Sequence, residues 1–280
     1  MELDLDSIGS RTEPHPVDWD SEDALLYALG VGAGSGDTAA ELAFTTENSA
    51  GVEQQVLPTF AVVLGWDAPR PAFGTVDTSQ LVHAEQSLVL HQPLPVAGKG
   101  FIIRSIDEIY DKGSGALVRT GSTLVDDTGE PLVELQGGAF IRGAGGFGGE
   151  RGPTTTWAAP ARGADLVVHQ PTLDIQALLY RLSGDRNPLH SDPAFARRGG
   201  WDRPILHGLC TFGFVGRALL HGAAGSDPAR FRAMSARFSA PVLPGDTLTT
   251  SIWVEGSDVL FQTHVGERLV LAHGTAEVAS

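Results

Sequence analysis

The sequence predicts an α+β protein made of two similar halves, in each of which an apolar helix is wrapped by an antiparallel sheet. Three observations indicate this architecture. The 280 residues fit two units of roughly equal size, since single domains usually have ~100–200 residues. Short motifs of the first half recur about 153 residues later. Apolar residues follow a helical period in some segments and alternate in others, which is typical of mixed helices and strands.

A stretch near the middle of the chain divides the halves. Residues 143–163 are rich in Gly, Pro, Thr and Ala and have no apolar period, so we predict a linker there. The expected units are therefore residues 1–142 and residues 164–280.

Two repeats support a duplication. The segment ALLYAL at 24–29 matches ALLYRL at 177–182, and LPTF at 57–60 matches LCTF at 209–212. Each half is thus expected to contain a helix, a loop, a second helix and then several strands. Two weak repeats indicate duplication, because a solenoid would need more units.

The helices of the second half are predicted from spacing and end signals. Apolar residues at 175, 178, 179 and 182 form one stripe, and Gly184 and Pro188 end that helix. Asp192 followed by Pro193 predicts a short helix that closes at Gly199 and Gly200. The apolar run LCTFGFVGRALL at 209–220 predicts a buried helix.

Alternation predicts the strands. The segments 101–106, 247–254 and 259–265 each place apolar side chains at every second position. The sequence DDTG at 126–129 predicts a hairpin turn between two further strands.

Composition excludes several classes of protein. The net charge of −15 (19 basic minus 34 acidic residues) argues against a nucleic-acid partner. A single cysteine, Cys210, rules out an intramolecular disulfide and a Cys-rich zinc site, and we expect it to be a packed side chain. No run of 18 apolar residues occurs and the first ten residues are acidic, so we expect no membrane partner, no signal peptide and a cytoplasmic location.

The densest polar cluster is SGDRNPLHSD at 183–192. Asp185, Asn187 and His190 lie between two predicted helices, in a loop whose shape Gly184 and Pro188 restrict. A carboxylate beside an imidazole can orient a water molecule and move its proton, which is general acid–base catalysis. From spacing alone, helix caps and a surface histidine would explain the same residues equally well.

A second feature is the sequence PILHGL at 204–209, which leads into the predicted buried helix. Gly208 is expected in the first turn, where backbone N–H groups lack helical partners. A glycine there lets an oxygen approach closely, as an oxyanion hole requires. An ordinary turn glycine is the alternative.

The two segments YRLSGDRNPLHSDP and PILHGLCTFG together resemble the hydratase 2 motif of MaoC-like dehydratases, the (R)-specific 2-enoyl-CoA hydratases found also in peroxisomal multifunctional enzymes. ENSAGVEQQVLPTFAVVLGW resembles the amino half of the same enzymes. The resemblance implies a double hot-dog fold and the reversible hydration of trans-2-enoyl-CoA to (3R)-3-hydroxyacyl-CoA, in fatty-acid or related metabolism that includes sterol side chains. It also implies no metal, no cofactor and a homodimer.

Carried over by residue, the resemblance implies that Asp185 and His190 hold the attacking water and that Asn187 positions Asp185 or the water. It implies that the Gly208 N–H binds the thioester oxygen. His207, beside it, is a candidate substrate-binding residue.

The repeat predicts one active site per chain. Shifts of 152 or 153 residues place the four proposed catalytic residues opposite Gly32, Gly34, Asp37 and Val56, which lack their chemistry. We therefore expect the first half to help accept the acyl chain, with the loop 68–78 shaping the pocket. The histidines on strand-like segments are expected to be structural: His83, His91, His169, His264 and His273.

Charge is divided unequally between the halves. Residues 1–150 hold 7 basic and 23 acidic side chains, whereas residues 151–280 hold 12 and 11. Coenzyme A is strongly anionic, and arginines near the motif suit its phosphates. Arg186, Arg197 and Arg198 are the candidate contacts.

Two other functions stay open at this stage. A thioesterase would bind the same acyl-CoA but break the thioester. A non-catalytic acyl-CoA-binding subunit would leave the enoyl group unchanged, although the presence of both Asp185 and His190 argues against it.

Overall fold

The computed structural model describes residues 2–154 and 156–279 of the chain. Its main element is a 10-stranded antiparallel sheet with the order β2-β5-β6-β7-β4-β9-β12-β11-β10-β8. The two halves contribute five strands each, in mirrored order from the edges inward. β4 and β9 join the halves in the middle, where Glu85 pairs with Arg237 and Val89 with Ala233. The predicted α+β class and the duplication are confirmed.

The strands have these bounds: β1 Glu2–Leu3, β2 His15–Trp19, β3 Gly74–Thr75, β4 Leu81–Leu90, β5 Gly98–Asp111, β6 Gly115–Val125, β7 Pro131–Arg142, β8 Leu166–Pro171, β9 Phe231–Phe238, β10 Thr247–Glu255, β11 Asp258–Val265 and β12 Arg268–Val278. The α-helices are α1 Ser21–Gly30, α2 Leu42–Thr45, α3 Gln176–Tyr180, α4 Pro193–Arg198 and α5 Gly208–Gly222. Short 3-10 helices lie at Leu5–Ser7, Pro58–Val63 (η2), Thr78–Gln80, Arg181–Ser183 (η4), Pro188–His190 (η5) and Pro228–Arg230. All three predicted strands, the hairpin turn between β6 and β7, and the short helix α4 are confirmed.

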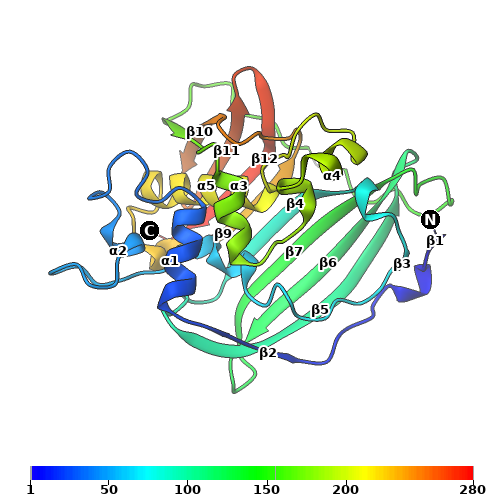
Figure 1. Cartoon of the computed structure of the whole chain (residues 1–280), viewed down its shortest axis with the longest axis horizontal. Helices are drawn as coiled ribbons and strands as arrows, with labels where there is room; N and C mark the ends of the chain where they lie inside the picture. Colours follow the sequence, from blue (N-terminus) through cyan, green and yellow to red (C-terminus); the bar gives the residue numbers. More distant parts are fainter. Residues whose placement is uncertain (1, 155, 280) are drawn as a thin grey trace.

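Helix α5 forms the centre of the core. Every residue from 209 to 220 is buried, as the apolar run predicts. Helices α1 and α3 lie side by side in front of α5 (Figure 1), and their equivalent tyrosines meet. Tyr27 and Tyr180 are both fully buried, with ring centroids 6.1 Å apart. The repeat is therefore visible as two neighbouring helices whose equivalent tyrosines pack together.

The second helix expected in the first half is much shorter than its counterpart. Pro58 opens η2, but the helix ends at Val63 because Leu64 is extended and Gly65 has a left-handed φ of 62°. η2 packs directly on α5, where a Cβ on Gly216 would collide with the Thr59 side chain. Among the residues described, only the second half has a long central helix, and this is a correction to the sequence prediction.

The apolar stripe that predicts α3 faces outward. Ile175 is 57% exposed and Leu178 51% exposed, whereas Gln176, Ala177 and Tyr180 are buried. The buried amide is satisfied because Gln176 Nε2 donates to the carbonyl oxygen of Gly30 at 2.6 Å. The helix prediction is correct, but the buried face is the opposite one.

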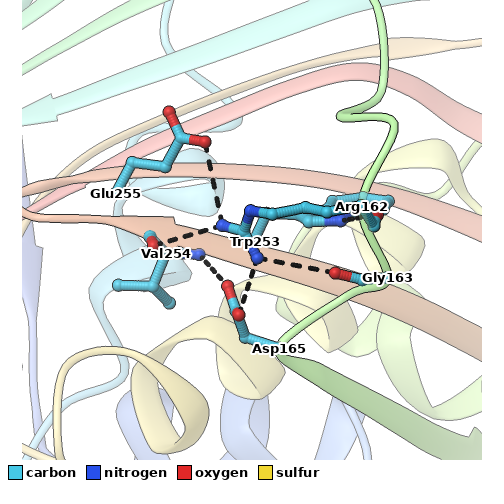
Figure 2. Close-up of polar contacts among 6 residues, drawn as sticks. All are labelled: Arg162, Gly163, Asp165, Trp253, Val254 and Glu255. Carbon is cyan, nitrogen blue, oxygen red and sulfur yellow. Dashed lines mark hydrogen bonds and ion pairs between the residues drawn. The ribbon is translucent and has the colours of Figure 1, made fainter.

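Residues 143–163 contain no helix or strand among the residues described, and Thr155 lies outside them. The end of this segment is tied to the sheet (Figure 2): Trp253 Nε1 donates to the Arg162 carbonyl at 3.0 Å, and Arg162 pairs with Asp165 at 2.6 Å. Asp165 in turn accepts the Val254 N–H at 2.8 Å. Because one sheet and one core run through both halves, the division into units 1–142 and 164–280 stays a prediction.

Within the described ranges, no helix is both long and apolar enough to cross a membrane.

Candidate active site

The polar loop after α3 is bent sharply at its start. Gly184 has a φ of 130°, and a Cβ on it would lie 2.8 Å from Cβ of Trp66. Only glycine fits that conformation in that space. The loop therefore rests directly on the first half of the chain.

Asp185 and Asn187 are held by turn hydrogen bonds. Asp185 Oδ1 accepts the backbone N–H of Asn187 at 3.1 Å. Asn187 Oδ1 accepts the backbone N–H of Leu189 at 3.0 Å and so caps η5. Asn187 thus contacts the Asp185 carboxylate through its backbone, while its side-chain oxygen holds the turn that presents His190.

His190 is oriented as a base. The side chain is buried, and its Nδ1 lies 2.8 Å from the carbonyl oxygen of Ile205. A carbonyl only accepts, so Nδ1 carries the hydrogen and the lone pair of the neutral ring is on Nε2. Burial lowers the pKa of His190, although the Ile205 carbonyl and the Asp185 charge oppose this. The imidazole is therefore neutral at neutral pH.

His207 supports the pair from behind. Its ring stacks on that of His190, with centroids 3.8 Å apart and an interplanar angle of 28°. Its Nε2 donates to the Asp185 backbone carbonyl at 3.2 Å. Burial, and next the neighbouring His190, lower the pKa of His207 to about 2. We expected His207 to contact the substrate. It is only 1% exposed and does not line the cavity, so it lies behind the residues that do.

Gly208 is the first residue of α5. Its N–H belongs to the first turn, which has no helical acceptor and carries the positive end of the helix dipole. A Cβ on Gly208 would lie 3.2 Å from the ring of Phe238, so that ring covers one side of the glycine.

One cavity of about 510 Å³ unites these groups. Asp185, Asn187, His190 and Gly208 all line it. The first half supplies the opposite wall, from η2, the following loop and the strands β4 to β7. Within the described part of the chain, none of the four first-half counterparts of the catalytic residues lines the cavity. This arrangement agrees with one acid–base pair per chain.

The arginines expected to meet coenzyme A lie elsewhere. Arg186, Arg197 and Arg198 are exposed and do not line the cavity, so their role stays a prediction.

Three arginines that sequence reasoning missed do line the cavity: Arg70, Arg104 and Arg142. Arg104 donates to the carbonyls of Ala68 and Gly65 and so holds the loop beside Trp66, and burial lowers its pKa to about 10. Arg70 stacks on Trp66 at 5.1 Å, and Arg142 on Trp201 at 5.5 Å. They are scattered along the chain, so no spacing could have identified them.

His83 is a further cavity residue that the sequence did not assign to the site. It was expected to be structural, but it lines the cavity from β4. The alternating pattern of its strand does not indicate that His83 faces a cavity.

Comparison with known proteins follows the division of the chain. Residues 18–143 match the MFE-2 hydratase 2 N-terminal domain, and residues 156–275 match the MaoC like domain. Over 99% of its length the chain is 45% identical to the 3-hydroxyacyl-thioester dehydratase Y of Mycobacterium tuberculosis, of which it covers 99%. The chain belongs to the MaoC-like hydratase 2 family. The resemblance read from the motif is confirmed.

Further relatives support both family and fold. The chain is 40% identical to the enoyl-CoA hydratase ChsH3 of the same organism, with 91% of each protein covered. It is also similar to the solved MaoC-like dehydratase of Phytophthora capsici, with a TM-score of 0.88, 31% identity, and 99% and 98% of the two chains covered. A Mycobacterium tuberculosis protein described as a double hotdog fold matches with a TM-score of 0.56 and 14% identity over 98% of this chain and 97% of that one. The double hot-dog class is therefore confirmed.

Proposed function

We propose that this MaoC-like hydratase 2 family member catalyses the reversible hydration of trans-2-enoyl-CoA to (3R)-3-hydroxyacyl-CoA. One observation carries the proposal. A carboxylate, a neutral imidazole with a free Nε2 and the first N–H of a buried helix line the same cavity. These three groups are what addition of water to an unsaturated thioester requires.

The reaction follows from this arrangement. Asp185 and Nε2 of His190 hold a water molecule, whose oxygen bonds to C3 while the pair takes one proton. The C2–C3 double bond opens toward the thioester, and its oxygen gains charge that the Gly208 N–H and the α5 dipole stabilise. A proton returned to C2 on the same face completes the hydration. In the reverse direction the same groups remove water.

The names of relatives support the substrate class. The two mycobacterial relatives are named for a 3-hydroxyacyl-thioester and for enoyl-CoA. A relative in Arabidopsis thaliana, 37% identical over 89% of this chain and 86% of that protein, is named a peroxisomal enoyl-CoA hydratase 2. We place the reaction in fatty-acid β-oxidation or in a related breakdown of acyl-CoA, including sterol side chains.

The test is incubation of the purified protein with crotonyl-CoA, the shortest convenient substrate. Hydration removes the ultraviolet absorbance of the conjugated thioester and yields (3R)-3-hydroxybutyryl-CoA on chiral analysis. Release of free thiol would instead identify a thioesterase, and unchanged absorbance a binding subunit. An (S) product would contradict the proposed geometry.

The reaction is proposed to need no metal or other cofactor. Donor atoms of Asp185, His190 and His207 do lie within 4.8 Å of one another. However, the two rings are stacked, and His190 Nδ1 and His207 Nε2 already bind backbone carbonyls. Lone pairs lie in the ring planes, so stacked rings direct them poorly at one ion. Activity should therefore survive exhaustive treatment with a chelator, and loss that zinc restores would overturn this.

A homodimer in the cytoplasm is proposed as the working form. Exposed leucines on α1 and α3 support a partner surface, with Leu29 42% and Leu178 51% exposed. Analytical ultracentrifugation of the wild type and of Leu178→Asp tests the assembly, because a charge at a buried interface would favour monomers. The location needs cell fractionation, since several relatives are named as peroxisomal.

A further inference from the structure

A polar cluster lines the cavity on the wall that the first half supplies. It surrounds Gly137 of β7. The atoms nearest to the place where a Cβ of Gly137 would lie are Thr120 Oγ1 at 3.4 Å, Gln86 Oε1 at 3.6 Å and His83 Nε2 at 3.7 Å. These side chains come from β4 and β6, which flank β7, and all four residues line the cavity. The missing side chain of Gly137 leaves the space between the three polar atoms open.

After their hydrogen bonds within the protein, these side chains still have donor and acceptor atoms available to a ligand in the cavity. Gln86 Nε2 donates to the Ser87 carbonyl at 2.8 Å, so its Oε1 remains as an acceptor. The Thr120 hydroxyl has only a long contact of 3.5 Å to the Gly137 carbonyl. Burial lowers the pKa of His83 to about 4, although the Glu85 backbone, the Asp185 charge and the Gln86 amide oppose this. His83 is therefore neutral at neutral pH, with one donor and one acceptor nitrogen.

The cluster is uncharged and contains both hydrogen-bond donors and acceptors, and this determines which chemical group it can bind. An alcohol both donates and accepts, and so it can satisfy an amide oxygen together with a hydroxyl or an imidazole. A carboxylate only accepts, and it would place a negative charge beside Gln86 Oε1. A plain alkyl chain would leave buried polar groups without partners, which costs ~1–3 kcal/mol for each group. The cluster thus fits a hydroxyl group better than either alternative.

The cluster is a neighbour of the catalytic groups but comes from different elements. The ring of His83 packs on Phe238, with centroids 4.9 Å apart, and the same Phe238 ring covers Gly208. The catalytic groups are on a loop and helix of the second half, whereas the cluster is on the sheet of the first half. A chain that ran from a thioester at Gly208 past the catalytic pair and along this sheet would meet the cluster beyond its double bond.

We propose that the natural substrate is an enoyl-CoA whose acyl chain carries a hydroxyl group, and that His83, Gln86 and Thr120 recognise this group. The proposal rests on the proposed function, because it requires that the cavity holds the acyl chain of a thioester.

The experiment compares matched substrates. Values of kcat/KM are measured for trans-2-enoyl-CoA thioesters of one chain length, either unsubstituted or with a single hydroxyl at successive carbons beyond C4, and for crotonyl-CoA. At one position the wild type should prefer the hydroxylated chain by about 10-fold or more. Thr120→Val removes the hydroxyl at nearly constant shape and should reduce that preference severalfold, with a larger loss of kcat/KM for the hydroxylated chain than for crotonyl-CoA.

Thr123→Val is the matched control, because Thr123 is on the same strand and does not line the cavity. It should leave the preference unchanged. Equal rates for plain and hydroxylated chains at every position would overturn the proposal. So would an equal loss of crotonyl-CoA hydration in Thr120→Val, since the cluster would then serve the reacting carbons. Failure of the wild type to hydrate any enoyl-CoA would instead reject the proposed function itself.

Discussion

The two halves of the chain begin from nearly the same motif and end with different helices. LCTF at 209–212 lies in α5, a buried helix of 15 residues, whereas LPTF at 57–60 lies in η2, a 3-10 helix of 6 residues. The helices before them, α1 and α3, correspond, and so do the strands of the large sheet, of which each half has one before these helices and four after them. One clear divergence therefore lies in the segment next to the cavity.

The difference explains how one cavity has two unlike walls. The long helix directs its first N–H groups at the cavity, beside the loop that carries Asp185 and His190. The short helix ends early, and residues of β4 to β7 line the cavity on the side of the first half. A second full helix in the first half would occupy space on that side. The duplication thus supplied two equivalent units of helix and sheet. In the first half the second helix is short, and the cavity lies where a longer helix would extend.

The largest expected effect comes from the acid–base pair, which only the second half contains. Asp185→Asn keeps the size of the side chain but removes its charge and basicity, so kcat for crotonyl-CoA should fall ~10²–10⁴-fold. Steady-state kinetics with the matched variant Asp37→Asn tests the asymmetry, because Asp37 is the first-half counterpart of His190 and is exposed. Similar losses in both variants would contradict a single site per chain.

Gly208 offers a test of the backbone N–H alone. Proline is accepted at the first position of a helix, and His207 already has the extended ψ of 136° that a residue before proline adopts. Gly208→Pro removes the N–H and should lower kcat ~10²–10³-fold. Gly208→Ala adds a Cβ but keeps the N–H, so it controls for contact with Phe238. If both variants lose the same activity, packing and not the N–H is responsible.

The next prediction concerns stability and a buried ion pair that links the two halves. Glu41 of the first half pairs with Arg217 of α5 at 2.9 Å, and it also accepts from His221 at 2.8 Å and from the Gly34 N–H at 2.9 Å. Glu41→Gln should lower the free energy of unfolding by ~2–4 kcal/mol, because a buried cation loses its partner. Urea denaturation measures this, with exposed Glu47→Gln as the control that should change it little.

The same carboxyl makes the stability depend on pH. Burial raises the pKa of Glu41, but the bonds from His221, Arg217 and Gly34 outweigh it and lower the pKa overall. The stabilisation is thus present above the pKa of an unfolded glutamate and is lost as pH falls through the lower, folded value. Glu41→Gln should remove that part of the acid dependence. An unchanged difference between the wild type and the variant across this range would contradict the assignment.

The sequence predicted those parts of the molecule that depend on local signals. Helix α5, the strands at 101–106, 247–254 and 259–265, the turn at 126–129 and the four motif residues that line the cavity follow from periodicity, turn signals and the motif. The opposite wall could not be predicted, because His83, Thr120 and Gly137 come from different strands and meet only through register. The exposed face of α3 was also beyond reach, since periodicity identifies a stripe but not what covers it.

The smallest expected change is in the pH profile of the wild type. An exposed histidine of ordinary pKa, ~6.5, would be half protonated at that pH and would have lost half of its basic form. Burial lowers the pKa of His190, so its Nε2 stays available below this value. The midpoint of the acid limb of kcat/KM for crotonyl-CoA should therefore lie below pH ~6.5, so that less than half of the activity at high pH is lost at pH ~6.5. The value of kcat/KM reports the free enzyme. A midpoint at or above ~6.5 would therefore contradict the burial of the His190 imidazole, because it is the value expected for an ordinary exposed histidine.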